Sequence, residues 1–437
     1  MDSNDNLKQR NAGYAAFFIS GICAISSSIV VSRLQGSYGF AYGMTGTLLS
    51  LMSIGNLIAG FLTGLLPTKI GTRLTVALLT TGYAIGYFAM GLTGWMGILM
   101  LAFVLVGLAK GCTLNTCTIL VGNNSPDRTK GMNVMHACYA LGALLCPFFI
   151  SAAAMAGSFV PLFVLAAFGL ILWLVFLCTQ METPPRFAQR QVAPPIPMRY
   201  ARGGALDGGK AHEKAGRSNG NAVRKNETTA KSSKTAAKAQ DGVPAGTKTD
   251  WSFLKSKKFW LLTGLIFCQN AAEYSVNGWM VTYFKNSGII SGNLSTYTVT
   301  VMWGATLLGR LLIAFVFPIK NACRAMIRMS LGCIVFYLGL MLVGSQIPAI
   351  VLLFAFAFSM AGMNPTAVAS AGRMTSAASM GIMLPVAGIG AIVMPWIAGI
   401  ISEHAGLNIG MASNIVPCIG LFVFAVLVAR VREEGNS

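Results

Sequence analysis

Long apolar stretches alternate with short polar connectors along most of the 437-residue chain. Six stretches precede residue 180 and six follow residue 258, and each is long enough for a helix of about 20 residues to cross a bilayer. Their ranges are near 12–31, 44–64, 74–94, 97–121, 131–153 and 159–179, then 259–284, 294–317, 325–345, 349–371, 375–402 and 407–429. The pattern predicts an all-α membrane protein with 12 transmembrane helices in two six-helix halves, residues 1–180 and 259–437.

A hydrophilic segment, residues 181–258, separates the two halves. It contains 16 Lys or Arg and 6 Asp or Glu, together with much Pro, Gly, Ser, Thr and Ala. Because this composition buries too little apolar surface to offset the entropy of folding, we expect a basic, disordered linker. Few aromatic residues accompany the basic ones, which argues against binding of nucleic acid.

The overall composition narrows the class of protein. Hydrophobic residues make up 54% of the chain and charged residues 10%, whereas soluble domains contain about a quarter charged residues. The sequence has no nucleotide-binding loop, nucleophile constellation or metal-ligand spacing. We therefore expect a monomer in the lipid bilayer that is not an enzyme and has no metal or other cofactor.

Basic residues in the short connectors predict the orientation in the membrane, because Lys and Arg are retained on the cytoplasmic side during insertion. With the N-terminus inside, two basic residues lie outside, Arg33 and Lys285. Twelve lie inside: Lys8, Arg10, Lys69, Arg73, Arg128, Lys130, Lys320, Arg324, Arg328, Arg373, Arg430 and Arg432. This bias predicts a multi-pass protein of the cell membrane with both termini in the cytoplasm. The linker then faces anionic lipid headgroups on the same side.

An internal repeat relates the two halves. Pro67-Thr-Lys-Ile-Gly-Thr-Arg73 follows the second stretch, and Pro318-Ile-Lys-Asn-Ala-Cys-Arg324 follows the eighth, 251 residues later. Leu141-Gly-Ala-Leu-Leu-Cys-Pro147 is repeated as Ile389-Gly-Ala-Ile-Val-Met-Pro395, 248 residues later. Two matches at nearly one offset predict parallel repeats, which in transporters rock around a shared central site.

The six-plus-six arrangement, the central loop and the repeat resemble the major facilitator superfamily. Its signature between the second and third spans is a Gly, an Asp four residues later, and basic residues around a second Gly. Gly64, Lys69, Gly71 and Arg73 fit this signature, but Thr68 stands in place of the Asp. The charge-relay role that the resemblance implies for that Asp is therefore in doubt.

Within the superfamily, the chain is most similar to the fucose-permease group of sugar and proton symporters. The likeness is carried by Asn133-Val-Met-His136, by Glu273-Tyr-Ser-Val-Asn-Gly-Trp-Met-Val-Thr-Tyr283, by Trp303-Gly-Ala-Thr-Leu-Leu-Gly-Arg310 and by Ala361-Gly-Met-Asn-Pro365. One departure is that the compared symporters have acidic groups in the N-terminal half, whereas the membrane domain has none there.

Four ionisable side chains lie well inside the predicted spans, away from their ends: Lys110, His136, Glu273 and Arg310. A charge at the bilayer centre costs at least about 2.5 kcal/mol, so each is a candidate for function. Glu273 is the one acid among them, and it could take up and release a proton as a cavity opens and closes. The alternative is a permanent ion pair that fixes helix packing.

The resemblance places Lys110 and Glu273 across a cavity, because the spans that carry them line the cavity in this superfamily. A Lys110–Glu273 pair that opens when substrate displaces one partner would couple binding to movement; the alternative is a static bridge. Arg310 lies nearer the cytoplasmic end of its span, and this position favours a helix-end or gate contact over a role as a carboxylate clamp. His136 favours a packing role over proton handling.

Neutral polar and aromatic residues complete the candidate site. They are Asn56, Asn115, Tyr139, Gln269, Asn270, Asn277, Trp303 and Asn364. Such groups suit recognition of hydroxyls and stacking on a small ring, but they also serve as hydrogen-bonding links between membrane helices. Pro147, Pro365, Pro385 and Pro395 predict helix bends.

These features favour a secondary transporter that moves a small polar solute, sugar-like or a small organic acid, with proton coupling. Sodium is an alternative coupling ion because carbonyls and amides bind it without a dedicated motif. Three other functions remain open: proton-driven export of amphipathic compounds, exchange of organic anions, and a transporter-like sensor.

Overall fold

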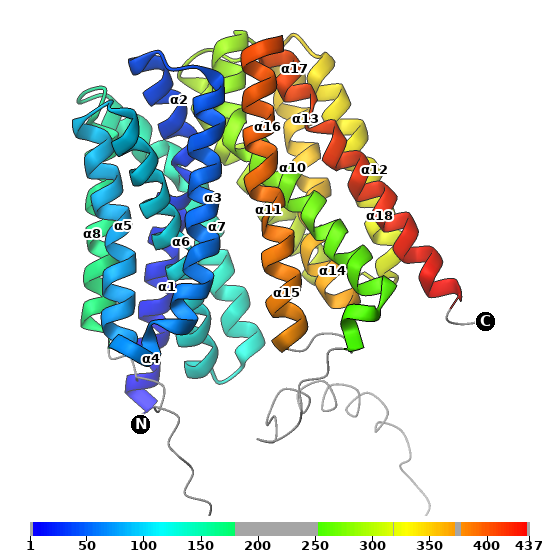
Figure 1. The fold of residues 1–437 in the computed structure, drawn as a ribbon, viewed down its shortest axis with the longest axis horizontal. Coiled ribbons are helices and arrows are strands. Elements are labelled where there is room, and N and C mark those ends of the chain that lie inside the picture. Colours follow the sequence, from blue (N-terminus) through cyan, green and yellow to red (C-terminus); the bar gives the residue numbers. More distant parts are fainter. Residues whose placement is uncertain (1–2, 180–251, 318, 372–376, 435–437) are drawn as a thin grey trace, which may run out of the picture. The chain divides into compact units, whose positions relative to one another are not determined.

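The computed structural model describes residues 3–179, 252–317, 319–371 and 377–434, and every regular element in these ranges is a helix (Figure 1). The predicted all-α fold is confirmed. The first half contains α1 (Ser3–Ile25), α2 (Ser27–Tyr38), α3 (Tyr42–Leu65), α4 (Pro67–Ile70), α5 (Thr72–Leu92), α6 (Met96–Asn124), α7 (Arg128–Ala154) and α8 (Val160–Cys178). The second half contains α10 (Lys257–Ser287), α11 (Thr298–Phe315), α12 (Ala322–Leu342), α13 (Gln346–Met360), α14 (Met363–Ser370), α15 (Ala377–Gly388), α16 (Gly390–Ala405), α17 (Leu407–Ala412) and α18 (Ile415–Glu434). The short 3-10 helices η1 (Ser252–Lys255) and η2 (Leu294–Tyr297) precede α10 and α11.

Most of the predicted linker, residues 181–251, lies outside the described residues. In its last part, residues 252–255 form η1 and residues 257–258 begin α10, which differs from the predicted disorder. The Phe253 side chain is buried, and its ring centroid lies 5.0 Å from that of Phe259. The Ser256 side chain accepts a hydrogen bond from the Phe259 amide at the start of α10, at 3.4 Å. A buried ring and a helix cap stabilise this last part of the segment.

The helices fit the twelve predicted spans. Ten helical segments of the described chain are long and apolar enough to cross a membrane. The other two spans are α10 and α11, which carry polar candidates of the site. The first span is longer than predicted and ends at Tyr38, with a break at Ser26 between α1 and α2. There the Ser26 and Tyr87 hydroxyls share a hydrogen bond of 2.9 Å, and Tyr87 also donates to the Cys23 carbonyl.

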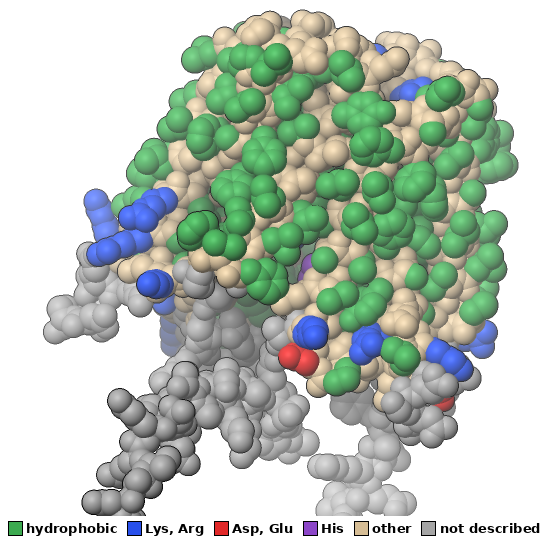
Figure 2. Space-filling model, turned by 180° about the vertical axis from the view of Figure 1, so that it is seen from behind, with side chains coloured by type: hydrophobic (Ala, Val, Ile, Leu, Met, Phe, Trp, Pro, Cys, Tyr) green, Lys and Arg blue, Asp and Glu red, His purple; other side chains and the backbone are tan. Residues whose placement is uncertain are grey.

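Apolar side chains cover much of the outer surface. Figure 2 shows hydrophobic side chains over most of one face, with Lys and Arg gathered mainly toward its lower rim. Large exposed apolar residues include Phe61, Leu78, Phe88, Ile119, Leu311, Phe315 and Val351. Soluble monomers rarely expose so much contiguous apolar surface, so this surface faces lipid.

The two halves use the same helix contacts. In the first half α1 packs on α7, α3 on α6, and α5 on α8; in the second, α10 packs on α16, α11 on α13, and α12 on α18. Gly142 of α7 leaves no room for a Cβ against the Phe18 carbonyl of α1. Gly390 of α16 has the same relation to the Phe267 carbonyl of α10. The sequence repeat therefore preserves a close crossing in which only glycine fits.

The halves touch through one end of the bundle, which we call the closed end. It lies opposite the N-terminus and includes the starts of α3 and α11 and the ends of α10 and α16 (Figure 1). An added Cβ on Gly46 of α3 would lie 2.6 Å from the Pro395 carbonyl and 3.1 Å from Cα of Gly399 on α16. One turn away, the Gly43 amide donates to Glu403 Oε2 at 2.9 Å. These contacts bring α3 and α16 together across the two halves.

A second set of contacts closes the same end between other helices. The Thr300 hydroxyl of α11 donates to the Leu144 carbonyl of α7 at 2.9 Å. The Asn286 amide of α10 donates to the Tyr42 hydroxyl at 3.2 Å. Nearer the middle of the bundle, the Ser50 hydroxyl of α3 donates to the Ile392 carbonyl at the start of α16 at 2.6 Å. In the described residues, no hydrogen bond joins the halves beyond this point, on the side of the N-terminus.

Candidate functional site

A cavity of about 540 Å³ lies between the two halves. Its wall comes from α1, α2, α3, α6 and α7 of the first half and from α10, α11, α14, α15 and α16 of the second. This volume is within the range of small-molecule sites, about 300 to 1,000 Å³. Both halves thus contribute to one site, as the internal repeat predicts.

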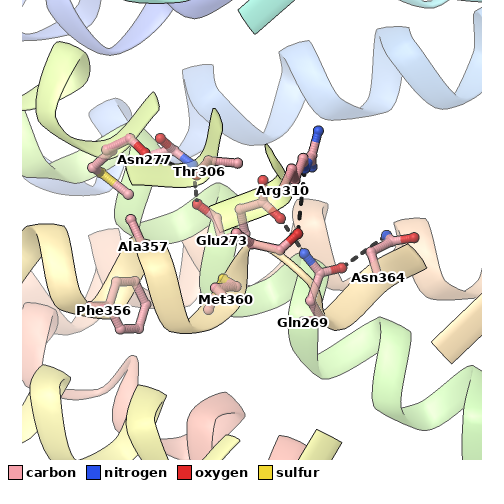
Figure 3. Close-up of a pocket in the computed structure, with 11 residues that line it drawn as sticks. Gln269, Glu273, Asn277, Thr306, Arg310, Phe356, Ala357, Met360 and Asn364 are labelled. Carbon is pink, nitrogen blue, oxygen red and sulfur yellow. Dashed lines mark hydrogen bonds between the residues drawn. The ribbon is translucent and has the colours of Figure 1, made fainter. Parts of the chain in front are cut away.

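Glu273 lies near the middle of α10 and projects into a chain of polar groups (Figure 3). The Gln269 amide donates to Glu273 Oε2, and the Asn364 amide of α14 donates to Gln269 Oε1 at 3.0 Å. The Asn277 amide donates to the Glu273 carbonyl at 3.0 Å. Because residues 269, 273 and 277 are four apart, they share one face of α10. The sequence spacing alone therefore places the acid and its two amide neighbours together.

Lys110, near the middle of α6, does not pair with Glu273 as predicted. Its ammonium nitrogen lies 4.7 Å from the centroid of the Tyr274 ring on α10. In the described part of the chain, no ion pair links Lys110 to Glu273. One oxygen of the Glu273 carboxylate accepts a hydrogen bond from Gln269 instead. Lys110 does face the second half across the cavity, as expected, but its contact is a cation on an aromatic ring.

Arg310 of α11 lies where α13 ends and α14 begins. Its Nε donates to the Ala361 carbonyl at a long 3.4 Å (Figure 3). In a continuous helix that carbonyl would accept from residue 365, which is a proline and has no amide hydrogen. Arg310 thus contacts the break between α13 and α14, and its guanidinium also lines the central cavity.

A small pocket of about 10 Å³ lies beside Glu273 within the second half. Its wall includes Gln269, Glu273, Asn277, Thr306 and Arg310. The volume suits a single water molecule. The carboxyl group therefore borders both the central cavity and a polar recess behind it.

Aromatic rings form the part of the wall shared by α7 and α11. The Tyr139 and Trp303 ring centroids lie 5.5 Å apart at 66°, so the rings meet edge to face across the halves. Phe17 of α1 packs on Tyr139 at 4.9 Å and on His136 at 5.7 Å. Trp303 is 9% exposed, and its indole Nε1 has no hydrogen-bond partner in the described residues. His136 both packs on a ring and lines the cavity.

The structure brings most of the predicted site residues together. Those that line the central cavity are Lys110, His136, Tyr139, Asn270, Glu273, Asn277, Trp303, Arg310 and Asn364. Gln269 lines the small pocket instead, and the Asn270 amide also donates to the Ala387 carbonyl of α15 at 3.1 Å. The Asn115 amide donates to the Thr63 hydroxyl of α3 at 2.8 Å, outside both cavities. Asn115 therefore has the helix-linking role that was the alternative for such amides.

Residues that sequence reasoning missed also line the cavity. Tyr274 carries the contact with Lys110, and Ser27, Ser28 and Ser53 add hydroxyls to the wall. Tyr274 directly follows Glu273, but adjacent helical residues point about 100° apart, so their proximity to one cavity was not evident. The serines lie in otherwise apolar helices, where Ser commonly bonds to its own backbone and carries little signal.

The charge of the cavity wall is unbalanced. Lys110 and Arg310 both interact electrostatically with Glu273 without forming an ion pair with it in the described residues. Two basic side chains thus accompany one carboxyl group. Among the described residues, no group of three or more His, Cys, Asp or Glu side chains could hold a metal ion.

Comparisons with known proteins agree with this architecture. Residues 13–384 match the family model described as Major Facilitator Superfamily. The crystal structure of the nucleoside transporter NupG is similar at a TM-score of 0.67 and 14% identity, covering 98% of each chain. A bacterial homolog of the human lysosomal transporter Spinster, inward-facing and occupied, is similar at a TM-score of 0.66 and 12% identity, covering 97% of this chain and 96% of that one. No curated protein matches the sequence. At these identities the two structures establish the shared fold.

Proposed function

Because the chain belongs to the major facilitator superfamily, we propose that it is a secondary transporter that moves a small polar solute by alternating access of the central cavity. The observation that carries the proposal is the position of Glu273, an acid in the wall of a cavity between two repeated halves. An ionisable group within a membrane domain marks a substrate or ion pathway by default. The resemblance of its surroundings to the fucose-permease group supports a sugar-like solute, and Lys110 and Arg310 in the same wall support a small organic acid.

Transport requires the closed end to open. The α3–α16 contacts at Gly46 and Gly399 and the Glu403 contact with Gly43 join the halves there. Rocking of the halves would separate these groups and close the opposite end over the solute. With both termini in the cytoplasm, as the basic connectors predict, the closed end would face outside and this conformation would be the inward-open state in the cell membrane.

Glu273 is the proposed coupling group. In its ionised form it accepts from Gln269 and is stabilised by the nearby cations Lys110 and Arg310. When it is protonated, the wall gains one unit of positive charge and Glu273 can donate a hydrogen bond of its own. The two forms therefore differ in their interactions with a solute in the cavity, which is what coupling needs. Sodium is the less favoured coupling ion, because Lys110 and Arg310 beside the same carboxyl group would repel a bound sodium ion.

Transport in proteoliposomes tests the proposal. The purified full chain is reconstituted, and uptake of labelled sugars, nucleosides and organic acids is measured with and without an imposed pH gradient, in sodium and in potassium buffers. A saturable uptake that the pH gradient drives uphill supports proton-coupled transport. Uphill uptake that needs a sodium gradient would show that sodium, not the proton, is the coupling ion. Binding without flux would indicate a sensor instead of a transporter.

A further inference from the structure

We propose that the central cavity takes a small organic anion, with its acidic group held between Lys110 of the first half and Arg310 of the second. The inference deepens the transport proposal by naming the class of solute, and it rests on that proposal only for the statement that the bound anion is transported. Both cations line the cavity, and each comes from a different half.

The first support is that the two cations lack a carboxylate partner. Lys110 contacts the Tyr274 ring, and Arg310 makes one long hydrogen bond to the Ala361 carbonyl through Nε. The guanidinium has five donor hydrogens, which match a carboxylate in a bidentate arrangement. Charges in a membrane domain are normally paired, and in the described residues neither of these two forms an ion pair. A bound anion would supply the missing partner.

The second support is the charge sum of the wall. Lys110 and Arg310 contribute two positive charges, and an ionised Glu273 contributes one negative charge. The sum is +1 with Glu273 ionised and +2 with Glu273 protonated, and protonation of His136 would raise either value. A monoanion therefore neutralises the wall in the first case. Protonation of Glu273 strengthens the attraction, so that proton and anion favour each other's binding.

The third support is independent of charge. The Trp303 side chain is 9% exposed and lines the cavity, yet its indole N–H has no acceptor among the described residues. A buried donor without a partner costs about 1–3 kcal/mol, which an acceptor on a ligand would recover. Trp303 lies on α11, as does Arg310. A carboxylate or other oxygen-rich acid provides acceptors for both side chains.

Other classes of solute fit this wall less well. A neutral sugar offers hydroxyl acceptors for Trp303 but leaves the two cations without counter-charge. An amphipathic cation meets repulsion from both, which disfavours the export alternative. A small acid that also carries hydroxyl groups satisfies the cations and uses the amides of Asn270, Asn277 and Asn364 as well.

Matched pairs of acids and their neutral amides test the inference. The probes are lactate and lactamide, gluconate and gluconamide, and benzoate and benzamide, added to the purified full chain at one pH and constant ionic strength. Thermal unfolding reports binding, since a ligand that binds the folded state raises the unfolding temperature. At least one acid should protect the protein, and its amide should protect at least about tenfold more weakly.

The Lys110→Gln and Arg310→Gln variants should each weaken binding of that acid by about tenfold or more, because each removes a charged hydrogen-bond partner. Lys110→Arg should retain most of the affinity. Lys285→Gln removes an exposed cation outside the cavity and is the matched control, expected to bind as the parent does. Unfolding temperatures without ligand identify any variant that fails to fold.

Three results would overturn the inference: protection by the amides as strong as by the acids, no protection by any acid, or unchanged affinity in both charge-removing variants. Flux measurements on the acid that binds separate the two proposals. An acid that binds through Lys110 and Arg310 but never crosses the membrane leaves the anion site standing and refutes transport. A neutral solute that is transported while acids fail to bind leaves transport standing and refutes the anion site.

Discussion

The Lys110 ammonium nitrogen lies 4.7 Å from the centroid of the Tyr274 ring, so a cation of the first half rests on an aromatic ring of the second. Cation–π contacts contribute about 0.5–1 kcal/mol at exposed sites and about 2 kcal/mol where water is excluded. The contact is strong enough to orient the ammonium group and weak enough to yield to a carboxylate. It therefore suits a binding site better than a permanent bridge between the halves.

Substitution of Tyr274 tests this contact. Tyr274→Phe keeps the ring and should bind substrate within about twofold of the parent, whereas Tyr274→Leu should lose about 0.5–2 kcal/mol of the interaction that holds Lys110. The measurement is substrate affinity from thermal shifts in each variant. Equal affinities in the Phe and Leu variants would show that the ring acts only as packing volume.

Glu273→Gln should uncouple transport from protons. Gln resembles the protonated carboxyl group in shape and charge, so substrate should still bind and exchange across the membrane, while uphill accumulation driven by a pH gradient should stop. Proteoliposome flux with and without the gradient distinguishes the two activities. Accumulation that continues in the variant would make Glu273 a structural residue and end the coupling proposal.

Gly46→Leu should prevent the contact between α3 and α16 that shuts the closed end. A Cβ at this position would lie 2.6 Å from the Pro395 carbonyl, and backbone atoms at a helix crossing cannot easily move aside. Flux should fall at least about tenfold, as for other overpacked crossings that cost about 1–3 kcal/mol. A cysteine at Ser53 in the cavity should react faster than in the parent with an impermeant maleimide added outside, because the cavity stays open on that side.

Gly60→Leu is the matched control on the same helix. A Cβ at Gly60 meets nothing within 4 Å, so this variant should keep both the flux of the parent and the parent's labelling rate at position 53. Loss of flux in both variants would point to a general effect on folding of α3. Unchanged flux in Gly46→Leu would show that this crossing does not form during the transport cycle.

Pro365→Ala should reduce the contribution of Arg310 to the stability of the protein. An alanine amide can bond to the Ala361 carbonyl, which Arg310 now contacts at 3.4 Å. Arg310→Gln should therefore destabilise the protein by about 0.5–1.5 kcal/mol in the parent and by less in the Pro365→Ala background. Thermal unfolding of the two single variants and the double variant gives the coupling. Strictly additive effects on stability would show that Pro365 and Arg310 act independently.

Labelling from outside tests the orientation. In a Cys178→Ala background, Ser37→Cys and Ser291→Cys place exposed thiols at the closed end, and Thr68→Cys places one at the opposite end. An impermeant maleimide on intact cells should label the first two and spare the third. The reverse pattern would place both termini outside and turn the structure into an outward-open state.

The sequence determined the helical membrane fold and the candidates for the site. Apolar stretches of about 20 residues can cross a bilayer in few ways, because every backbone amide and carbonyl must find a partner within the chain. The cost of an ionisable group in that setting singled out Lys110, His136, Glu273 and Arg310, and all four line the central cavity. The four-residue spacing of Gln269, Glu273 and Asn277 also placed these side chains on one helix face.

The tertiary structure decided which partner each of these groups has. Lys110 contacts Tyr274 instead of Glu273, although the two residues are neighbours in α10. Asn115 bonds to Thr63, whereas Asn364, an amide of the same type, bonds to Gln269 beside the cavity. Helical periodicity fixes the face of a single helix, but contacts between helices depend on the rotation and crossing of each pair. Those quantities come from packing across the whole bundle, as at Gly46 and Gly399, and no single stretch of sequence contains them.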